Sequence, residues 1–194
     1  MQLVLSSSSS ARQALLKRFK IDFSTFSPDV DETAFDNETI IETVSRLAIK
    51  KAKAATNAFP HALIIGSDQL IAVEDQILGK PGNHENAQNQ LALCSNKILT
   101  SYTSLCLFNA NTGETQRDVI EYQVKFKPLN ETLIEQYLQA DQPYQCAGSI
   151  KAESLGPTLF EWMRGDDPNA LTGLPLIRLN TMLTESGFNI FSQD

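Results

Sequence analysis

Ala62-Leu63-Ile64-Ile65-Gly66-Ser67-Asp68-Gln69 places four apolar residues directly before a glycine and a polar segment. Such a continuous apolar run predicts a strand buried on both faces, as in the centre of an α/β sheet. We expect this strand to end at Gly66, so that Asp68 lies where strand ends in α/β proteins open into ligand crevices. A hairpin is predicted next, from residues 69–73 through the Glu74-Asp75 turn to residues 76–78.

The segment before this strand alternates between strand and helix patterns. Residues 3–5 are apolar, residues 6–10 are all serine, and apolar side chains recur at helical spacing from Ala14 to Phe19. Apolar residues at 21, 23 and 26 predict a second strand. Asn37 is expected to cap a long helix that carries Lys51 close to its apolar border.

The segment after the hairpin continues the alternation. The predicted elements are a helix from Asn83 through Cys94, strands at about 98–108 and 114–126 joined by a turn, a helix from Asn130 to about Ala140, and a last helix from Pro175 through Thr184. Strands that alternate with helices, together with one long hairpin, indicate an α/β protein with a mixed sheet. We treat residues 1–194 as a single domain and place a waist near residues 128–145.

Composition excludes several classes of protein. The net charge of −7 argues against general nucleic-acid binding, because counterion release needs a broad Lys/Arg surface. The first residues lack a basic segment and no apolar stretch approaches ~20 residues, so we expect a cytoplasmic protein that does not enter a membrane. Cys94, Cys106 and Cys146 are odd in number and widely spaced, which favours reduced core thiols.

The serine run is a candidate anion site. Backbone N–H groups at the start of a helix favour anions, and Arg12 lies in the first turn of the predicted helix. A flexible serine-rich terminus is the alternative, and the flanking strand and helix favour phosphate binding. No G-x-x-x-x-G-K-[ST] motif is present, so this is not a P-loop.

Asp68 is the candidate catalytic carboxylate. Partial burial and a nearby divalent cation would let it position or deprotonate a water molecule, although a lone aspartate at this place is more often a turn residue. Lys51 and Lys80 could neutralise phosphate oxygens, or each could be an ordinary solvated lysine.

Two acidic pairs, Asp31-Glu32 and Asp166-Asp167, could hold Mg²⁺ or Mn²⁺, or could simply belong to solvated loops. His61 and His84 have no spacing typical of zinc ligands. No G-x-S-x-G sequence supports a serine hydrolase.

Taken together, six segments resemble the ordered motifs of the Maf family of nucleoside triphosphate pyrophosphatases. They are residues 5–16 (LSSSSSARQALL), 30–33 (VDET), 66–69 (GSDQ), 79–81 (GKP), 147–153 (AGSIKAE) and 167–176 (DPNALTGLPL). The resemblance implies a two-lobed α/β fold with a mixed sheet flanked by helices, similar to the inosine triphosphate pyrophosphatases (the Maf/Ham fold). It also implies a divalent cation and hydrolysis of a nucleoside triphosphate to the monophosphate and pyrophosphate.

The resemblance also implies roles for individual residues. Asp68 matches the proton acceptor, and Glu32 matches an acidic position near the metal, so Glu32 and Asp68 are the expected metal ligands. The positions expected to line the phosphates are Ser7, Arg12, Lys51 and Lys80. No nucleic acid or membrane partner is implied, and family resemblance suggests a homodimer.

Substrate choice depends on a smaller set. Gly-Ser-Asp-Gln and the Lys-x-Glu at 151–153 resemble the branch that acts on 7-methyl-GTP, so Gln69 and Glu153 are specificity candidates. A carboxylate can accept from the N1–H and amine of guanine and complement the positive charge of an N7-methylated base. Trp162 could stack on that base, or could simply pack in the core. Ala11 departs from the usual Pro at another position linked to substrate choice, and Gln13 replaces an Arg.

Three functions follow from these motifs. The first is hydrolysis of 7-methyl-GTP to 7-methyl-GMP, which would keep modified nucleotides out of nucleic acids. The second is the same reaction on dTTP or UTP, whose branch typically has Thr after the Asp. The third is a nucleotide-sensing regulator of cell division and septum formation, which needs no turnover.

Overall fold

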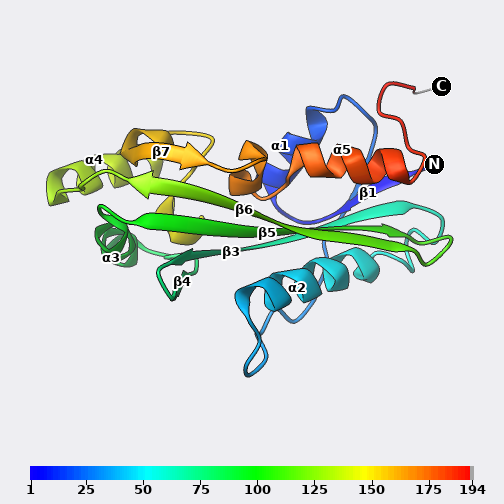
Figure 1. Cartoon of the computed structure of the whole chain (residues 1–194), viewed down its shortest axis with the longest axis horizontal. Coiled ribbons are helices and arrows are strands. Elements are labelled where there is room, and N and C mark those ends of the chain that lie inside the picture. The colour runs from blue at the N-terminus through cyan, green and yellow to red at the C-terminus, as the bar shows by residue number, and fades with distance from the viewer. Residues whose placement is uncertain (193–194) are drawn as a thin grey trace. The chain divides into compact units, whose positions relative to one another are not determined.

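The computed structural model describes residues 1–192 of the chain. Its strands are β1 (Leu3–Ser6), β2 (Ser24–Phe26), β3 (Leu63–Val73), β4 (Gln76–Leu78), β5 (Ile98–Asn109), β6 (Thr115–Phe126) and β7 (Phe160–Arg164) (Figure 1). Its helices are α1 (Ser10–Lys17), α2 (Ile40–Ala54), α3 (His84–Cys94), α4 (Glu131–Asp141) and α5 (Leu176–Glu185), with short 3-10 segments at Ala147–Ser149, Gly156–Leu159 and Pro168–Thr172. The predicted alternation of strands and helices is confirmed.

The strands form a mixed seven-stranded sheet. Its order is β2-β1-β3-β5-β6-β7, and β4 pairs with β3. β1 is parallel to both β2 and β3, whereas the β3–β4 and β6–β7 pairs are antiparallel. The α/β class with a mixed sheet is therefore confirmed, as is the hairpin predicted after Gln69.

The chain divides into two compact units. Unit 1 comprises Met1–Gln69, Tyr102–Ile120 and Gly173–Asp194, and unit 2 comprises Leu70–Ser101 and Glu121–Thr172. The waist predicted near 128–145 is wrong, because these residues lie inside unit 2. The chain passes between units within β3, β5 and β6 instead, and a fourth time between Thr172 and Gly173. Because each of these three strands continues without a break, its sequence has no glycine or proline that would mark the boundary between the two units.

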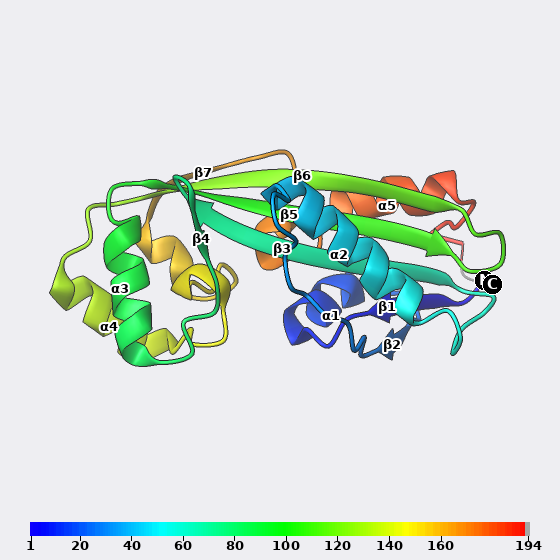
Figure 2. The same cartoon turned by 90° about the horizontal axis from the view of Figure 1, so that it is seen from below.

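In unit 1, helices cover the sheet on two faces (Figure 2). One apolar cluster joins α1 and α5 to the strands, with Leu16 and Leu179 packed against residues of β1 and β3 such as Leu5 and Ile65. A second cluster joins α2 to the opposite face through Ala48, Ala52, Val4 and Ile64 among others. The alternation of strand side chains sends Ile65 toward one helical layer and Ile64 toward the other.

The first turn of α2 differs from the sequence prediction. Thr39, not Asn37, is the N-cap, and Thr39 and Glu42 form a reciprocal capping box. Asn37 instead has a positive φ of 65°, in the left-handed region that Asn tolerates. Both residue types favour helix starts, and the glutamate three residues after Thr39 decides between them because it satisfies a second backbone N–H.

β3 does not end at Gly66 but runs on to Val73, so the predicted end of this strand is wrong. Gly66 is a point of close approach to α2. A Cβ atom there would lie 2.2 Å from the Ala48 carbonyl oxygen and 2.7 Å from the Ala52 nitrogen. Glycine is therefore required so that helix and strand can touch, and not because the strand stops.

Unit 2 contains α3 and α4, which lie side by side (Figure 2). The helices start at Asn83 and Asn130 as predicted, and each asparagine is the N-cap, accepting a hydrogen bond from a backbone N–H three residues later. α5 in unit 1 also begins after Pro175, as expected. Phe126 of β6 and Phe160 of β7 pack edge to face, with ring centroids 5.1 Å apart.

The three cysteines are free thiols. Cys94 and Cys106 are buried, and burial raises the pKa of each to about 12, whereas Cys146 is only half-buried.

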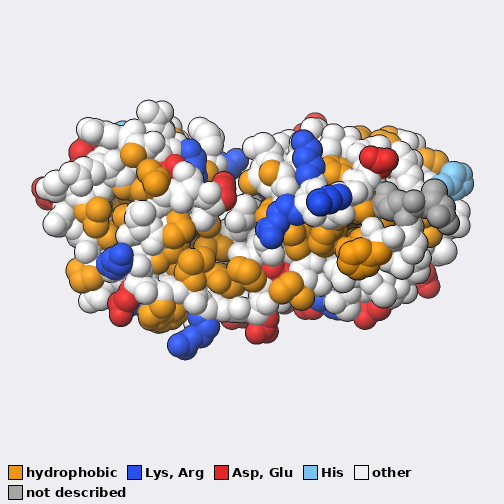
Figure 3. All heavy atoms as spheres, turned by 90° about the horizontal axis from the view of Figure 1, so that it is seen from above, with side chains coloured by type: hydrophobic (Ala, Val, Ile, Leu, Met, Phe, Trp, Pro, Cys, Tyr) orange, Lys and Arg blue, Asp and Glu red, His pale blue; other side chains and the backbone are white. Residues whose placement is uncertain are grey.

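Within residues 1–192, no helix combines the length and the apolar character that crossing a bilayer requires. On the face shown in Figure 3, Lys and Arg side chains form small separate groups with hydrophobic side chains between them.

Candidate active site

Asp68 lies in unit 1, on β3, two residues past the last pair that this strand forms with β1. The parallel register ends at Ser6 and Gly66, where β1 gives way to the serine loop and β3 continues. Asp68 points to the same side of β3 as Gly66, which is the side that α2 covers. Its side chain is almost fully buried.

Lys51 of α2 holds two carboxylates. Its ammonium nitrogen lies 2.6 Å from Oδ1 of Asp68 and 2.7 Å from Oε1 of Glu32. Lys51 and Asp68 are both buried, whereas the Glu32 side chain is 60% exposed. Ser6 of β1 fixes the same turn of α2, because its hydroxyl donates to the Lys51 carbonyl oxygen at 2.5 Å. Glu32, Lys51 and Asp68 therefore form one contiguous ionic group.

The pKa of Asp68 is raised above its usual value. The main cause is desolvation by burial, and the neighbouring Lys51 and Arg12 oppose it by favouring the ionised form. Glu32 adds a repulsion that raises the pKa further. A carboxylate with a raised pKa accepts a proton more readily than an exposed aspartate, which suits a general base.

The loop that carries Glu32 is tied to α2 on both sides of that residue. Lys50 donates to the Asp31 carbonyl oxygen at 2.9 Å, and Arg46 donates to the Thr33 carbonyl oxygen at 3.1 Å. Asp31 itself accepts from the backbone and hydroxyl of Thr33. Three cations from two turns of α2 thus fix the backbone and side chain of Glu32.

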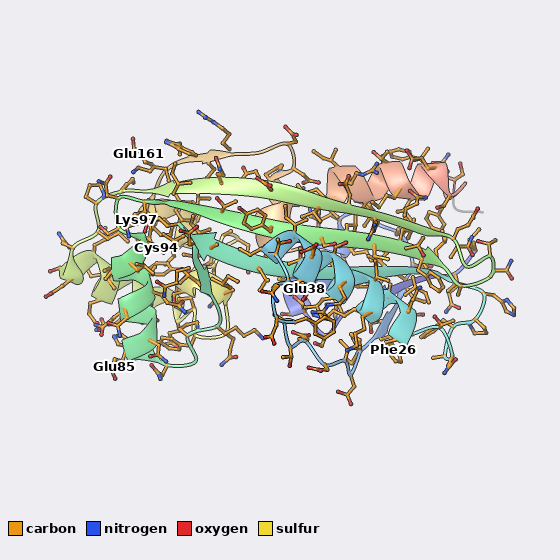
Figure 4. All side chains as sticks on the ribbon, turned by 60° about the horizontal axis from the view of Figure 1, so that its bottom comes forward. Phe26, Glu38, Glu85, Cys94, Lys97 and Glu161 are labelled. Atoms are coloured by element: carbon orange, nitrogen blue, oxygen red, sulfur yellow. The ribbon has the colours of Figure 1, made fainter. Side chains whose placement is uncertain are left out.

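Arg46 has further partners in the same loop. It forms a two-point ion pair with Glu38, at 2.6 Å through both Nε and Nη2, and its guanidinium lies 4.0 Å from the Phe35 ring centroid. Figure 4 labels Glu38 where the loop joins α2. The Arg46 guanidinium holds the pKa of Glu38 at about 2.

The serine loop leads into the N-terminus of α1. Ser9 is the N-cap and accepts from the Arg12 backbone N–H, and buried Ser7 accepts from the Ser9 N–H. Strand, serine loop and helix therefore occur in the predicted order. Ala11 lies half-buried in the first turn of α1.

Arg12 reaches back to a segment far away in sequence. Its Nε donates to the Gly173 carbonyl oxygen at 2.8 Å, and Ser67 donates to the same oxygen at 2.8 Å through its hydroxyl. Burial lowers the pKa of Arg12, while Asp68 and Glu32 oppose that shift. Arg12 therefore belongs to the electrostatic environment of Asp68.

Gln69 follows Asp68 on β3 and faces the opposite side of the sheet. Its side-chain amide donates to the hydroxyl of buried Thr103 on β5 at 3.1 Å. The structure thus brings Ser7, Arg12, Glu32, Lys51, Asp68 and Gln69 into unit 1.

Two predicted site residues, Lys80 and Glu153, belong to unit 2, and both are exposed. Lys151, two residues before Glu153, donates from its backbone N–H to the Tyr137 hydroxyl at 3.1 Å. Trp162 of β7 is half-buried and lies under the Arg164 guanidinium, 5.0 Å from ring centroid to Cζ. The ring of Trp162 therefore already has a cationic partner.

In the second acidic pair, Asp167 stabilises the loop that follows it. Asp167 is buried and accepts from the backbone and side chain of Asn169 at 3.0 and 2.9 Å. Across residues 1–192, no group of three or more His, Cys, Asp or Glu side chains is arranged to hold a metal ion. Glu32 and Asp68 are the pair of carboxylates that converge on one point, the Lys51 ammonium.

Sequence reasoning missed Ser67, Gly173, Arg46 and Lys50. Their roles come from contacts with backbone carbonyl groups, which any residue type provides and no motif encodes. Gly173 lies within the closing motif, so its position could have been noted but its partners could not.

The chain is similar to a known protein family over most of its length. The model of the family described as Maf-like protein matches residues 2–186. The chain belongs to the Maf family. Among its Maf-family relatives, a protein of Pseudoalteromonas translucida (strain TAC 125), named 7-methyl-GTP pyrophosphatase, is 48% identical over 98% of this chain and 94% of its own length.

Other Maf-family relatives carry the same name. One from Methylobacillus flagellatus is 48% identical and one from Pseudomonas syringae pv. syringae is 47% identical, each over 97% of this chain and 98% of the relative. Among solved structures, a HAM1 protein from Coxiella burnetii matches 95% of this chain and 99% of its own with a TM-score of 0.53 at 16% identity. The expected similarity to the Maf/Ham fold is confirmed.

Proposed function

We propose that this Maf-family chain is a nucleotide pyrophosphatase that hydrolyses 7-methyl-GTP to 7-methyl-GMP and pyrophosphate. The observation that carries the proposal is full-length identity of 47–48% to relatives named for that activity. The ionic group of Glu32, Lys51 and Asp68 supports it, because a buried carboxylate with a raised pKa can serve as a general base. Removal of 7-methyl-GTP would keep a modified nucleotide out of nucleic acids.

We further propose that Glu32 and Asp68 hold a divalent cation, Mg²⁺ or Mn²⁺. Their oxygens converge on one cationic point, and Mg²⁺ is commonly bound by one or two carboxylates together with substrate phosphates. When bound, the cation would polarise phosphoryl oxygens and offset the charge of the departing pyrophosphate. The cation would then share the neutralisation of the two carboxylates with Lys51 and Arg12.

In the proposed reaction, Asp68 takes a proton from a water molecule as the water oxygen bonds to the α-phosphorus. The bond from the α-phosphorus to the oxygen that bridges to the β-phosphorus breaks, and its electron pair leaves with pyrophosphate. Lys51 and Arg12 favour the ionised form of Asp68, which accepts the proton, since both oppose the effect of burial on its pKa.

The phosphates would bind at the N-terminus of α1. Ser7, the first backbone N–H groups of the helix and Arg12 supply donors and positive charge for oxygens of the triphosphate. Lys80 of unit 2 is also predicted to bind oxygens of the triphosphate.

We propose that Gln69, Ala11 and Glu153 select the base of the nucleotide. The amide of Gln69 is oriented by Thr103, and amide groups supply both a donor and an acceptor for a base edge. Glu153 is exposed in unit 2 and is proposed to complement the positive charge of a methylated guanine.

The decisive experiment is a nucleotide panel assayed for pyrophosphate release with Mg²⁺, with Mn²⁺ and with EDTA. We expect 7-methyl-GTP to give the highest kcat/KM, above GTP, dTTP and UTP, and we expect EDTA to abolish release. A clear preference for dTTP or UTP would assign the chain to the other branch. No release from any nucleotide would reject the enzymatic proposal.

A nucleotide-sensing role in septum formation is separable from catalysis. If a division phenotype is rescued equally well by wild-type protein and by a catalytically inactive variant, binding alone carries that function. We also propose that the chain is cytoplasmic and forms a homodimer. Light scattering of the purified protein measures its oligomeric state directly.

A further inference from the structure

The carbonyl oxygen of Gly173 is a junction between distant segments of unit 1. It accepts 2.8 Å hydrogen bonds from Nε of Arg12 and from the hydroxyl of Ser67. Arg12 precedes Gly173 by 161 residues and Ser67 precedes it by 106. One backbone oxygen therefore links the first turn of α1, the strand that carries Asp68, and the segment leading into α5.

The nitrogen that Arg12 uses for this contact is informative. A guanidinium is a planar fork of five N–H donors, and a bond through Nε fixes the plane of that fork. The donors that remain for an anion are those of the two terminal nitrogens, which form the edge that binds phosphate in a two-point contact. Anchoring Nε thus orients the edge without consuming it.

Glycine is the residue that the junction requires. Gly173 has a φ of 99°, in the region that residues with a side chain rarely adopt. A Cβ atom at this position would also lie 3.1 Å from Nε of Arg12 and 3.5 Å from its Nη2. Any side chain would therefore strain the backbone and press on the guanidinium together.

We infer that Gly173 is a positioning residue that sets the guanidinium of Arg12 for the phosphates of the substrate, with Ser67 holding the shared carbonyl oxygen in place. The inference rests on the proposed function, because Arg12 must contact phosphate for its orientation to matter. Gly173 touches no reacting atom and acts through Arg12. Ser67, the residue before Asp68 on β3, links this arrangement to the strand that carries the carboxylate.

The test compares two glycine substitutions in unit 1. Gly173→Ala should raise KM for 7-methyl-GTP and weaken binding of inorganic pyrophosphate, measured by calorimetry, each by about tenfold, as expected for a displaced charge-assisted contact. Gly187→Ala is the matched control, because Gly187 also has a positive φ, 76°, but no atom lies within 4 Å of its added Cβ. The control should change neither quantity by more than about twofold.

A double-mutant cycle separates positioning from general damage. In an Arg12→Gln background, Gly173→Ala should have almost no further effect on KM or on pyrophosphate binding, since the group it positions is gone. A further tenfold loss in that background would overturn the inference. An Arg12→Gln enzyme with unchanged pyrophosphate binding would also overturn it while leaving the proposed reaction intact.

Two further measurements keep the outcomes distinct. If Gly173→Ala fails to fold, Ser67→Ala removes the second donor to the same oxygen and should raise KM in wild-type background but not in the Arg12→Gln background. Equal effects in both backgrounds would overturn the inference. Pyrophosphate calorimetry reads out the positioning of Arg12 even if wild-type protein hydrolyses no nucleotide, in which case the proposed function alone fails.

Discussion

Lys51, in the last turn of α2, donates to Asp68 across 2.6 Å, and Asp68 lies on β3 two residues past the last pair with β1. Both side chains are buried, and the same ammonium also binds Glu32. Burial nevertheless raises the pKa of Asp68, so desolvation outweighs the ion pair. The ion pair therefore opposes, but does not cancel, the rise that burial causes in the pKa of Asp68.

Asp68→Asn should abolish most turnover and leave the fold intact. The amide preserves the shape of the side chain but cannot accept the proton, so kcat should fall by about 10²-fold or more. Pyrophosphate release measures kcat, and circular dichroism with a thermal melt checks the fold. Asp75→Asn, in the exposed turn between β3 and β4, is the control. Near wild-type turnover in the Asp68 variant would remove Asp68 from the role of base.

Lys51→Met should destabilise the protein, because it leaves the buried Asp68 without its main counter-charge. Breaking a buried pair from one side costs on the order of 3 kcal/mol in free energy of unfolding, with the exposed Glu32 adding little. Urea denaturation measures the loss, and Lys17→Met on the exposed side of α1 should lose far less. The double variant Lys51→Met/Asp68→Asn should recover part of the stability. A double variant no more stable than Lys51→Met would contradict this account.

Gly66→Ala should lower both stability and turnover. The added methyl would meet the Ala48 carbonyl at 2.2 Å, so α2 and β3 must separate, at a cost of about 2 kcal/mol or more in free energy of unfolding. That separation also moves Lys51 away from Asp68. Gly79→Ala is the control for stability, since no atom lies within 4 Å of its added Cβ. Equal free energies of unfolding for the two variants would refute the close approach.

Glu38→Gln should destabilise the protein in a pH-dependent manner. Arg46 lowers the folded-state pKa of Glu38 from 4.5 to about 2, so Glu38 contributes stability above about pH 4.5 that is lost as the pH falls through about 2. The difference in free energy of unfolding between wild type and Glu38→Gln should therefore be constant near neutral pH and shrink on acidification. Glu161→Gln, on β7, is the control; Figure 4 labels both glutamates. A difference that does not vary with pH would show that charge plays no part.

The thiols should react slowly with alkylating reagents in the native protein. Burial raises the pKa of Cys94 and Cys106 to about 12, so almost no thiolate forms at pH 8, and both sulfur atoms are shielded. Mass spectrometry after iodoacetamide treatment should find Cys146 modified first, and all three modified in urea. Rapid native labelling of Cys94 would contradict its burial.

Local sequence patterns correctly predicted most of the helices and strands. The helix starts predicted at Asn83 and Asn130 were correct, because an N-cap is a contact between residues three apart, which sequence displays directly. Gly66 was misinterpreted as the end of a strand. Glycine marks both chain breaks and close approaches, and only the helix packed against it distinguishes the two.

By itself, the sequence determined the α/β class and the order of the elements, and it placed Asp68 and Arg12 in one set of motifs that resemble the Maf family. Those properties follow from periodicity and from residue type, which are local. Tertiary structure alone decided that Lys51 bridges Asp68 and Glu32, and that the Gly173 oxygen receives Arg12. Such contacts join residues up to 161 positions apart, and they exist only when the packing of helices on strands brings those residues together.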